Sequence, residues 1–337
     1  MKKFTKVLLS ALLALGVTAC GSSTSEGTPA ASTDSTTTTE TSEAATYTVG
    51  IVQLVQHVAL DASAQGFQDE LVKELGDAVT FDYQNAAGDS ATCSSIVSGF
   101  VTENVDLILA IATPALQASA NGTATIPVLG TAITEYGTAL SIDDFDGTVG
   151  TNVSGTSDLA PLDQQAAMFD ELLPDATTIG ILYCSAEANS KYQADVVKAS
   201  LEAAGKTVNV YTFTDSNDVQ AITTTAVAEN DALYIPTDNT AASNTGLIDP
   251  VASEAGVPII CGEEGIMSGC GIATLSIDYY ELGVTTGAMA ARFLKGEANV
   301  SEMPIEYYQN PVKEFDAERC EALGITVPSD YTAVARD

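Results

Sequence analysis

The strongest constraint on the fold is a phrase that occurs twice, in which a short apolar run ends in a turn and a helix start. It occurs at residues 106–121 (DLILAIATPALQASAN) and again at residues 231–244 (DALYIPTDNTAASN). In the first copy, Thr113 stands where an N-cap hydroxyl is expected, and Pro114 suits a first helical turn, where its missing N–H would have no partner. A buried strand that leads into a helix directs free backbone N–H groups at one point. Two such units therefore predict two similar lobes facing each other across a cleft that suits a small molecule.

Strand-like and helix-like segments alternate through the rest of the chain. Short apolar or β-rich runs predict strands, and apolar residues at helical spacing predict the helices between them. The strands are expected at residues 47–52, 79–83, 107–111, 127–130, 178–183, 208–213, 232–235, 257–261 and 272–277, and the main helices at residues 58–75, 90–101, 159–172, 189–204, 217–228 and 279–294. This alternation is typical of parallel, doubly wound sheets, and it restarts after Val149. We therefore predict an α/β fold with two flavodoxin-like lobes.

The composition excludes several classes of partner. The chain of 337 residues has 45 acidic and 12 basic side chains, a net charge of −33. Because such a surface repels nucleic acids and anionic lipid headgroups, we expect neither to bind. One histidine and the lack of any CxxC spacing argue against a metal site, and no cofactor is expected. Cys261 and Cys270 flank a Gly-rich loop that they would close as a disulfide. The alternative is that all five cysteines after Cys20 are buried thiols.

Residues 1–20 have the features of a bacterial lipoprotein signal peptide. Lysines at the start precede an apolar run at residues 7–17 that is too short to span a bilayer. The sequence VTAC, which ends at Cys20, resembles the lipobox, in which the cysteine becomes the lipidated first residue. Residues 21–46 are rich in Ser and Thr and lack the apolar surface needed to fold, so they predict a disordered tether. We expect a domain outside the cytoplasm that contacts the membrane only through a lipid on Cys20.

The polar residues that follow the predicted strands are the candidate ligand contacts. In doubly wound sheets, ligands bind beyond the carboxyl ends of the strands, and polar side chains converge there. The candidates are Gln53, His57, Thr113, Thr131, Asn189, Asp238, Asn239, Glu263 and Asp278. For Asp238, the alternative to a ligand contact is a plain helix N-cap.

The chain resembles the substrate-binding lipoproteins of one family of bacterial ABC importers. The resemblance rests on six segments in order, VGIVQLVQHVALDASAQGF, FDYQNAAGD, AIATPALQA, YCSAEANS, PTDN and SIDYYELGVTTGAMA. It implies a type I periplasmic-binding fold whose lobes are joined by a hinge of three crossovers. The first lobe would comprise residues 47–153 and 279–303, and the second lobe residues 154–278 and 304–337. The sequence departs from the family pattern at Val58, where Pro is common, and at Glu135, where Asp-Pro is usual.

The resemblance also implies a function, which is capture of a small solute between the lobes and its delivery to an ABC permease. Better-understood members bind aromatic amino acids, so we expect a zwitterionic amino acid with an apolar or aromatic side chain. Its carboxylate would lie at Thr113, helped by Thr131, and its ammonium at a carboxylate, first of all that of Asp238. Gln53 and Asn189 would add neutral hydrogen bonds.

Other functions remain open on the same fold. A ligand-sensing receptor subunit and a binder of nucleosides or sugars are the alternatives. Against an enzyme, the sequence has no GxGxxG after its first strand, no P-loop and no GxSxG elbow. The single His57 also leaves little room for a histidine-assisted triad.

Overall fold

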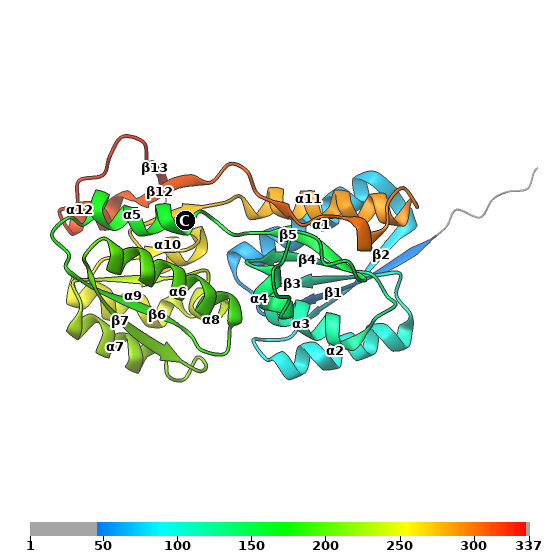
Figure 1. Cartoon of the computed structure of the whole chain (residues 1–337), viewed down its shortest axis with the longest axis horizontal. Coiled ribbons are helices and arrows are strands. Elements are labelled where there is room, and N and C mark those ends of the chain that lie inside the picture. Colours follow the sequence, from blue (N-terminus) through cyan, green and yellow to red (C-terminus); the bar gives the residue numbers. More distant parts are fainter. Residues whose placement is uncertain (1–45, 335–337) are drawn as a thin grey trace, which may run out of the picture. The chain divides into compact units, whose positions relative to one another are not determined.

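Two sheets organise the part of the chain that the computed structural model describes, residues 46–334 (Figure 1). The expected signal peptide, Cys20 and the tether up to residue 45 lie outside the described residues. Among the described helices, none combines the length and the apolar character needed to cross a membrane.

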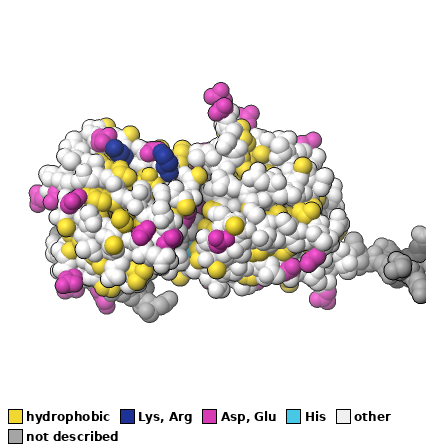
Figure 2. All heavy atoms as spheres, turned by 90° about the horizontal axis from the view of Figure 1, so that it is seen from below, with side chains coloured by type: hydrophobic (Ala, Val, Ile, Leu, Met, Phe, Trp, Pro, Cys, Tyr) yellow, Lys and Arg dark blue, Asp and Glu magenta, His cyan; other side chains and the backbone are white. Residues whose placement is uncertain are grey.

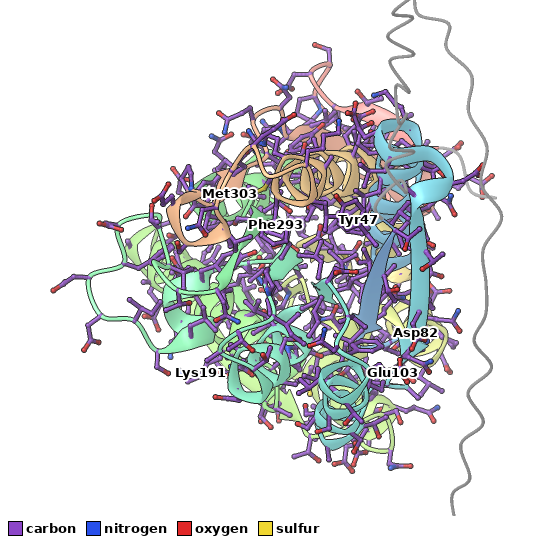
Figure 3. The ribbon with its side chains drawn as sticks, turned by 90° about the vertical axis from the view of Figure 1, so that its right-hand side faces the viewer. Tyr47, Asp82, Glu103, Lys191, Phe293 and Met303 are labelled. Carbon is purple, nitrogen blue, oxygen red and sulfur yellow. The ribbon has the colours of Figure 1, made fainter. Side chains whose placement is uncertain are left out.

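The first sheet is entirely parallel, and its strands follow in the order β11-β5-β4-β3-β1-β2. Its centre is the run LILAI of β3, which is buried throughout, as expected of a parallel strand covered on both faces. Helices α1 and α11 cover one face and α2 covers the other (Figures 1 and 3). The strands are β1 (Tyr47–Gln53), β2 (Val79–Asn85), β3 (Leu107–Ile111), β4 (Val128–Ile133), β5 (Val153–Ser157) and β11 (Glu306–Tyr307), and the helices are α1 (Val58–Leu75), α2 (Ser90–Glu103), α3 (Thr113–Gly122), α4 (Tyr136–Leu140) and α11 (Tyr279–Leu294), with the short turns η1 (Gly76–Ala78) and η2 (Val300–Glu302).

The second sheet repeats the parallel pattern and adds two strands from the tail. Its order is β13-β12-β10-β9-β8-β6-β7, and β12 runs antiparallel to β10. The two-lobe, doubly wound α/β prediction is therefore confirmed. The strands are β6 (Thr178–Cys184), β7 (Thr207–Phe213), β8 (Ala232–Ile235), β9 (Ile259–Cys261), β10 (Ala273–Ser276), β12 (Val312–Asp316) and β13 (Thr332–Val334), and the helices are α5 (Leu162–Leu172), α6 (Ala188–Ala203), α7 (Val219–Glu229), α8 (Asn239–Ala242), α9 (Thr245–Ala255), α10 (Glu264–Cys270) and α12 (Ala317–Ala322).

The first sheet includes strand β5 and a short strand from the tail of the chain. Strand β5 pairs with β4, and β11 pairs with β5, so the first sheet extends to Ser157 and takes in residues 306–307. The expected boundary at residue 153 falls on the first residue of β5, and the one at residue 303 precedes β11. The run VSGTS of β5 carries no apolar pattern that would mark a strand. Glycine at position 155 allows β5 to pair with β4. Gly155 has φ 142°, and a Cβ atom there would be 2.1 Å from the carbonyl oxygen of Gly130.

The cysteines of the folded region follow the buried-thiol alternative. All five are free and buried in the described structure. Cys261 and Cys270 share an apolar cluster with Ile266 and Met267 inside the second lobe, and no disulfide joins them. Each therefore acts as a small hydrophobic side chain.

Helix α11 returns to the first lobe and packs along α1 at very short range. A Cβ atom at Gly66 would lie 2.1 Å from the carbonyl oxygen of Tyr280, and one at Gly283 would lie 2.1 Å from that of Ser63. The hydroxyl of Ser63 also donates to the carbonyl of Tyr279 at 3.1 Å. Because glycine alone permits this approach, the pair of helices fixes where α11 begins, next to the site described below.

We expect Gly283→Ala to lower the free energy of unfolding by about 1–3 kcal/mol, since the added methyl overpacks the helix contact. Gly99→Ala is the matched control, because Gly99 is exposed on helix α2 and a Cβ atom there meets nothing within 4 Å. That control should be neutral or stabilising by up to about 1 kcal/mol. Urea denaturation measures both changes, and equal effects at the two positions would contradict the packing argument.

Candidate functional site

Buried polar side chains gather where the carboxyl ends of both sheets meet. Asp158 follows β5, Glu187 follows β6, Asp238 follows β8 and Glu263 follows β9, and all four are at least nine-tenths buried. Asp158 accepts a hydrogen bond at 3.1 Å from the hydroxyl of Tyr279, the first residue of α11. The contact joins a residue at the first crossover to one at the second, so the groups of both lobes form one polar region.

Thr113 lies at a helix start, but it is not the cap that the sequence predicts. The N-cap position of α3 belongs to Ala112, which has φ 79° and ψ 156° and makes no side-chain capping bond. Because this left-handed residue turns the chain one position early, Thr113 and Pro114 fall inside the first turn. Strain of this kind, about 1–3 kcal/mol, is concentrated at binding and catalytic sites. The hydroxyl of Thr113 is buried and has no hydrogen-bond partner among the described residues.

Two of the predicted ligand contacts are occupied within the first lobe. Gln53 donates to the carbonyl of Val55 at 2.9 Å and to Asp61 at 2.7 Å, and it accepts from the hydroxyl of Tyr83 at 2.7 Å. The hydroxyl of Thr131 accepts from Thr156 at 3.3 Å. Both side chains stabilise the lobe through these bonds.

The three carboxylates that the sequence offers for an ammonium all cap helices. Asp238 accepts from the backbone N–H of Ala241 and of Cys184, each at 2.7 Å, which is the N-cap alternative. Glu263 caps α10 through two backbone N–H groups at 2.6 Å. Asp278 caps α11 through the N–H of Glu281 at 3.0 Å and is exposed. Both oxygens of Asp238 and of Glu263 are therefore engaged with the backbone, and one oxygen of Asp278 is.

Asn239 is held by Glu187, a residue that sequence reasoning did not select. Glu187 accepts from the backbone N–H and the side-chain amide of Asn239, at 3.0 and 2.6 Å, and from the N–H and hydroxyl of Thr240, at 2.9 and 2.8 Å. The carboxylate of Glu187, in the loop after β6, thus pairs with the backbone N–H groups at the start of α8. No local pattern could reveal this, because the two segments are 52 residues apart.

Four unpartnered polar atoms make this region a candidate binding site. Seven buried side-chain atoms in the described residues lack a hydrogen-bond partner, and four of them belong to residues at the carboxyl ends of the strands. These four are Thr113 Oγ1, His57 Nδ1, Asp158 Oδ1 and Asn189 Oδ1. Buried polar atoms are nearly always paired in folded proteins, so atoms left over in one region indicate partners from a bound molecule.

A cavity of about 210 Å³ is lined from both lobes, and none of the four residues with unpartnered atoms is part of its lining. Its walls include Leu54, Val55 and Pro114 from the first lobe and Glu187 and Thr240 from the second. The lining combines these few apolar residues with a larger number of polar ones, so the cavity is a polar space between the lobes at the start of α3.

The buried carboxyl groups have no cation beside them. Burial raises the pKa of Asp158 to about 6 and that of Glu263 to about 7. Burial, followed by the charge of Glu187, raises the pKa of Asp238 to about 8. Within the described residues, no lysine or arginine forms a salt bridge with any of the three. Burial therefore disfavours the charged forms of these carboxyl groups, and a cationic group that binds beside them would lower their pKa values and be stabilised in turn.

We expect the ligand-free protein to lose stability as pH rises from about 4 to about 6, because the pKa of Asp158 is raised in the folded state. The contribution is fully present below the unfolded-state pKa and is lost as pH rises through the folded value, about 3 kcal/mol at most. Asp158→Asn should flatten that part of the profile of unfolding free energy against pH. Asp143→Asn, at an exposed position, is the control and should leave the profile unchanged. Identical profiles for wild type and Asp158→Asn would contradict the expectation.

Comparisons with known proteins identify the family of the chain. Residues 48–337 match the family model of the ABC transporter substrate binding protein. The chain is 38% identical over 264 residues to a tyrosine-binding protein from Clostridioides difficile (strain R20291), a match that covers 76% of this chain and 75% of that protein.

Two solved structures extend the likeness. An ABC domain from Streptococcus pneumoniae in complex with L-Trp is 33% identical with a TM-score of 0.82, and the match covers 86% of this chain and 100% of that one. The ligand-free, open structure of a substrate binding protein with adhesive properties from Clostridium difficile is 37% identical with a TM-score of 0.65, at the same coverage. The fold is that of the type I periplasmic binding proteins. The chain therefore belongs to the family of ABC transporter substrate-binding proteins, which bind solutes outside the cytoplasm and are not enzymes.

Proposed function

We propose that this protein captures a free amino acid with an aromatic or apolar side chain between its lobes and delivers it to an ABC permease. The observation that carries the proposal is the set of unpartnered atoms, since it contains both a hydroxyl donor and a carboxylate acceptor. Relatives named for tyrosine binding and for a complex with L-Trp support the same class of ligand.

The two charged ends of an amino acid fit two different parts of the site. The carboxylate is assigned to the start of α3, where the Thr113 hydroxyl, free N–H groups and the helix dipole favour an anion. The ammonium is assigned to the free Oδ1 of Asp158 and to Oδ1 of Asn189. Asp158 is preferred to Asp238, because each oxygen of Asp238 already accepts from a backbone N–H.

Closure of the lobes on the ligand is part of the proposal. The structure is more similar to the L-Trp complex than to the open, ligand-free relative, with TM-scores of 0.82 and 0.65 at similar identity. This difference supports a receptor in which bound ligand favours the closed arrangement.

A thermal-shift screen of amino acids, nucleosides and sugars tests the class of ligand. A ligand at a hundred times its dissociation constant stabilises the folded state by about 2.7 kcal/mol, which is visible as a higher melting temperature. Stabilisation by nucleosides or sugars without any by amino acids would overturn the assignment.

We expect Thr113→Val to weaken binding of L-tyrosine or L-tryptophan about 10- to 150-fold, since it removes a hydrogen bond to a charged group worth about 1.5–3 kcal/mol. Stability of the ligand-free protein should not fall, because the hydroxyl has no partner within the described residues. Thr131→Val is the matched control. It breaks the bond with Thr156 and should cost about 1 kcal/mol of stability with little change in affinity. Calorimetry and urea denaturation separate the two effects, and unchanged affinity in Thr113→Val would refute the carboxylate site.

We further propose that a lipid on Cys20 anchors the protein to the outer face of the membrane. The support is the sequence VTAC after a charged and then apolar leader. Cys20→Ser should release the protein into the soluble fraction and remove the lipid mass from the intact-protein mass spectrum. A variant that still fractionates with membranes and carries the same added mass would exclude this anchor.

A further inference from the structure

His57 joins the two lobes at a point away from the crossovers. It occupies the N-cap position of α1 but makes no side-chain capping bond there. Its Nε2 atom lies 3.2 Å from Oδ1 of Asn239, the first residue of α8 in the second lobe. The imidazole therefore makes no capping bond to its own helix and is hydrogen-bonded to the second lobe instead.

The surroundings of Asn239 determine which nitrogen of the imidazole carries the proton. The side-chain amide nitrogen of Asn239 donates to Glu187 at 2.6 Å, so the amide oxygen faces His57. Nε2 must then be the donor, and Nδ1 of a neutral ring carries a lone pair. Nδ1 is buried without a partner in the described residues. A proton on Nδ1 would add a buried N–H group for which the described residues provide no acceptor, whereas the lone pair of the neutral ring can accept from a donor of the ligand.

The charges near the ring do not offset its burial. Burial lowers the pKa of His57, whereas the hydrogen bond to Asn239 and the charges of Glu187 and Asp61 raise it by less. Glu187 is engaged by Asn239 and Thr240, and Asp61 by the amide of Gln53. Both carboxylates therefore have other partners.

We propose that His57 is a positioning residue for closure, which as a neutral imidazole ties the first lobe to Asn239 and releases the second lobe when it is protonated. The inference rests on the proposed function, because it concerns the closed, ligand-bound form. In an open form the ring is exposed and titrates near its ordinary pKa of about 6.5. The open form then binds more protons than the closed form. Affinity is therefore full above about pH 6.5 and falls below it, by at most about tenfold per pH unit for one proton.

The chain contains a single histidine, so proton NMR of the tag-free full chain reads this group directly. We expect the pKa of His57 to fall when L-tyrosine or L-tryptophan is bound, with the neutral ring protonated on Nε2. In Asn239→Ala, the preference for the proton on Nε2 should be lost, because the acceptor of that proton is removed. A pKa and tautomer that are the same with and without bound ligand would overturn the proposal.

Calorimetry between pH 5 and 8 provides the second readout. His57→Gln keeps an amide N–H for Asn239 but cannot titrate, so its affinity should change less than that of wild type between pH 8 and pH 5.5. His57→Ala should bind more weakly at every pH. Gln56→Ala, at the exposed neighbouring position, is the control and should follow wild type. Asp158 titrates in all four proteins, so only the difference between their profiles reports on His57.

The outcomes distinguish this inference from the proposed function. Failure of every amino acid to bind at pH 8, together with binding of a nucleoside or sugar, refutes the proposed ligand class, and the same NMR titration with that ligand still decides the role of His57. If amino acids bind and the profiles of affinity against pH are identical for wild type and His57→Gln, only the proposed role of His57 in closure is refuted.

Discussion

A polar group that is buried must find a hydrogen-bond partner, and most of this site follows from that requirement. Parallel strands place their carboxyl ends at one edge, and the loops there carry polar side chains from both lobes. Most of these side chains are satisfied by helix starts, as Asp238 and Glu263 are. Those with an unpaired oxygen, among them Thr113 and Asp158, are the positions that we propose a ligand completes.

The electrostatics of the site lead to the same ligand chemistry. The surface is strongly acidic, and acidic side chains are spread over both lobes in the view of Figure 2. Surface charge keeps the protein soluble and is screened by salt, whereas the buried carboxyls of Asp158, Glu187 and Asp238 are screened much less. An ammonium group is the cation that fits such a site when the ligand also carries a carboxylate for the start of α3.

The scaffold holds this arrangement through close backbone packing. Glycines on α1 and α11 let the two helices approach until carbonyl groups nearly touch the opposing Cα atoms. Helix α11 therefore begins at a fixed place, and its first residue, Tyr279, supplies the hydroxyl that holds Asp158. Closure requires rigid lobes of this kind, because a tie such as His57–Asn239 can select one arrangement only if the lobes themselves do not deform.

The sequence alone determined the α/β class, the two lobes and the central strands, because buried parallel strands such as 107–111 are uninterrupted apolar runs bounded by turns. It also placed Thr113, His57, Asn189 and Asn239 at the edge where the site lies, since carboxyl ends of parallel strands converge. Only the tertiary structure decided which candidates are free. Gln53 and Thr131 are occupied within the first lobe, whereas Asp158 and Glu187 gain their roles from segments far away in the chain. Strand spacing is a local property that a sequence records, but hydrogen-bond satisfaction depends on every neighbour in space.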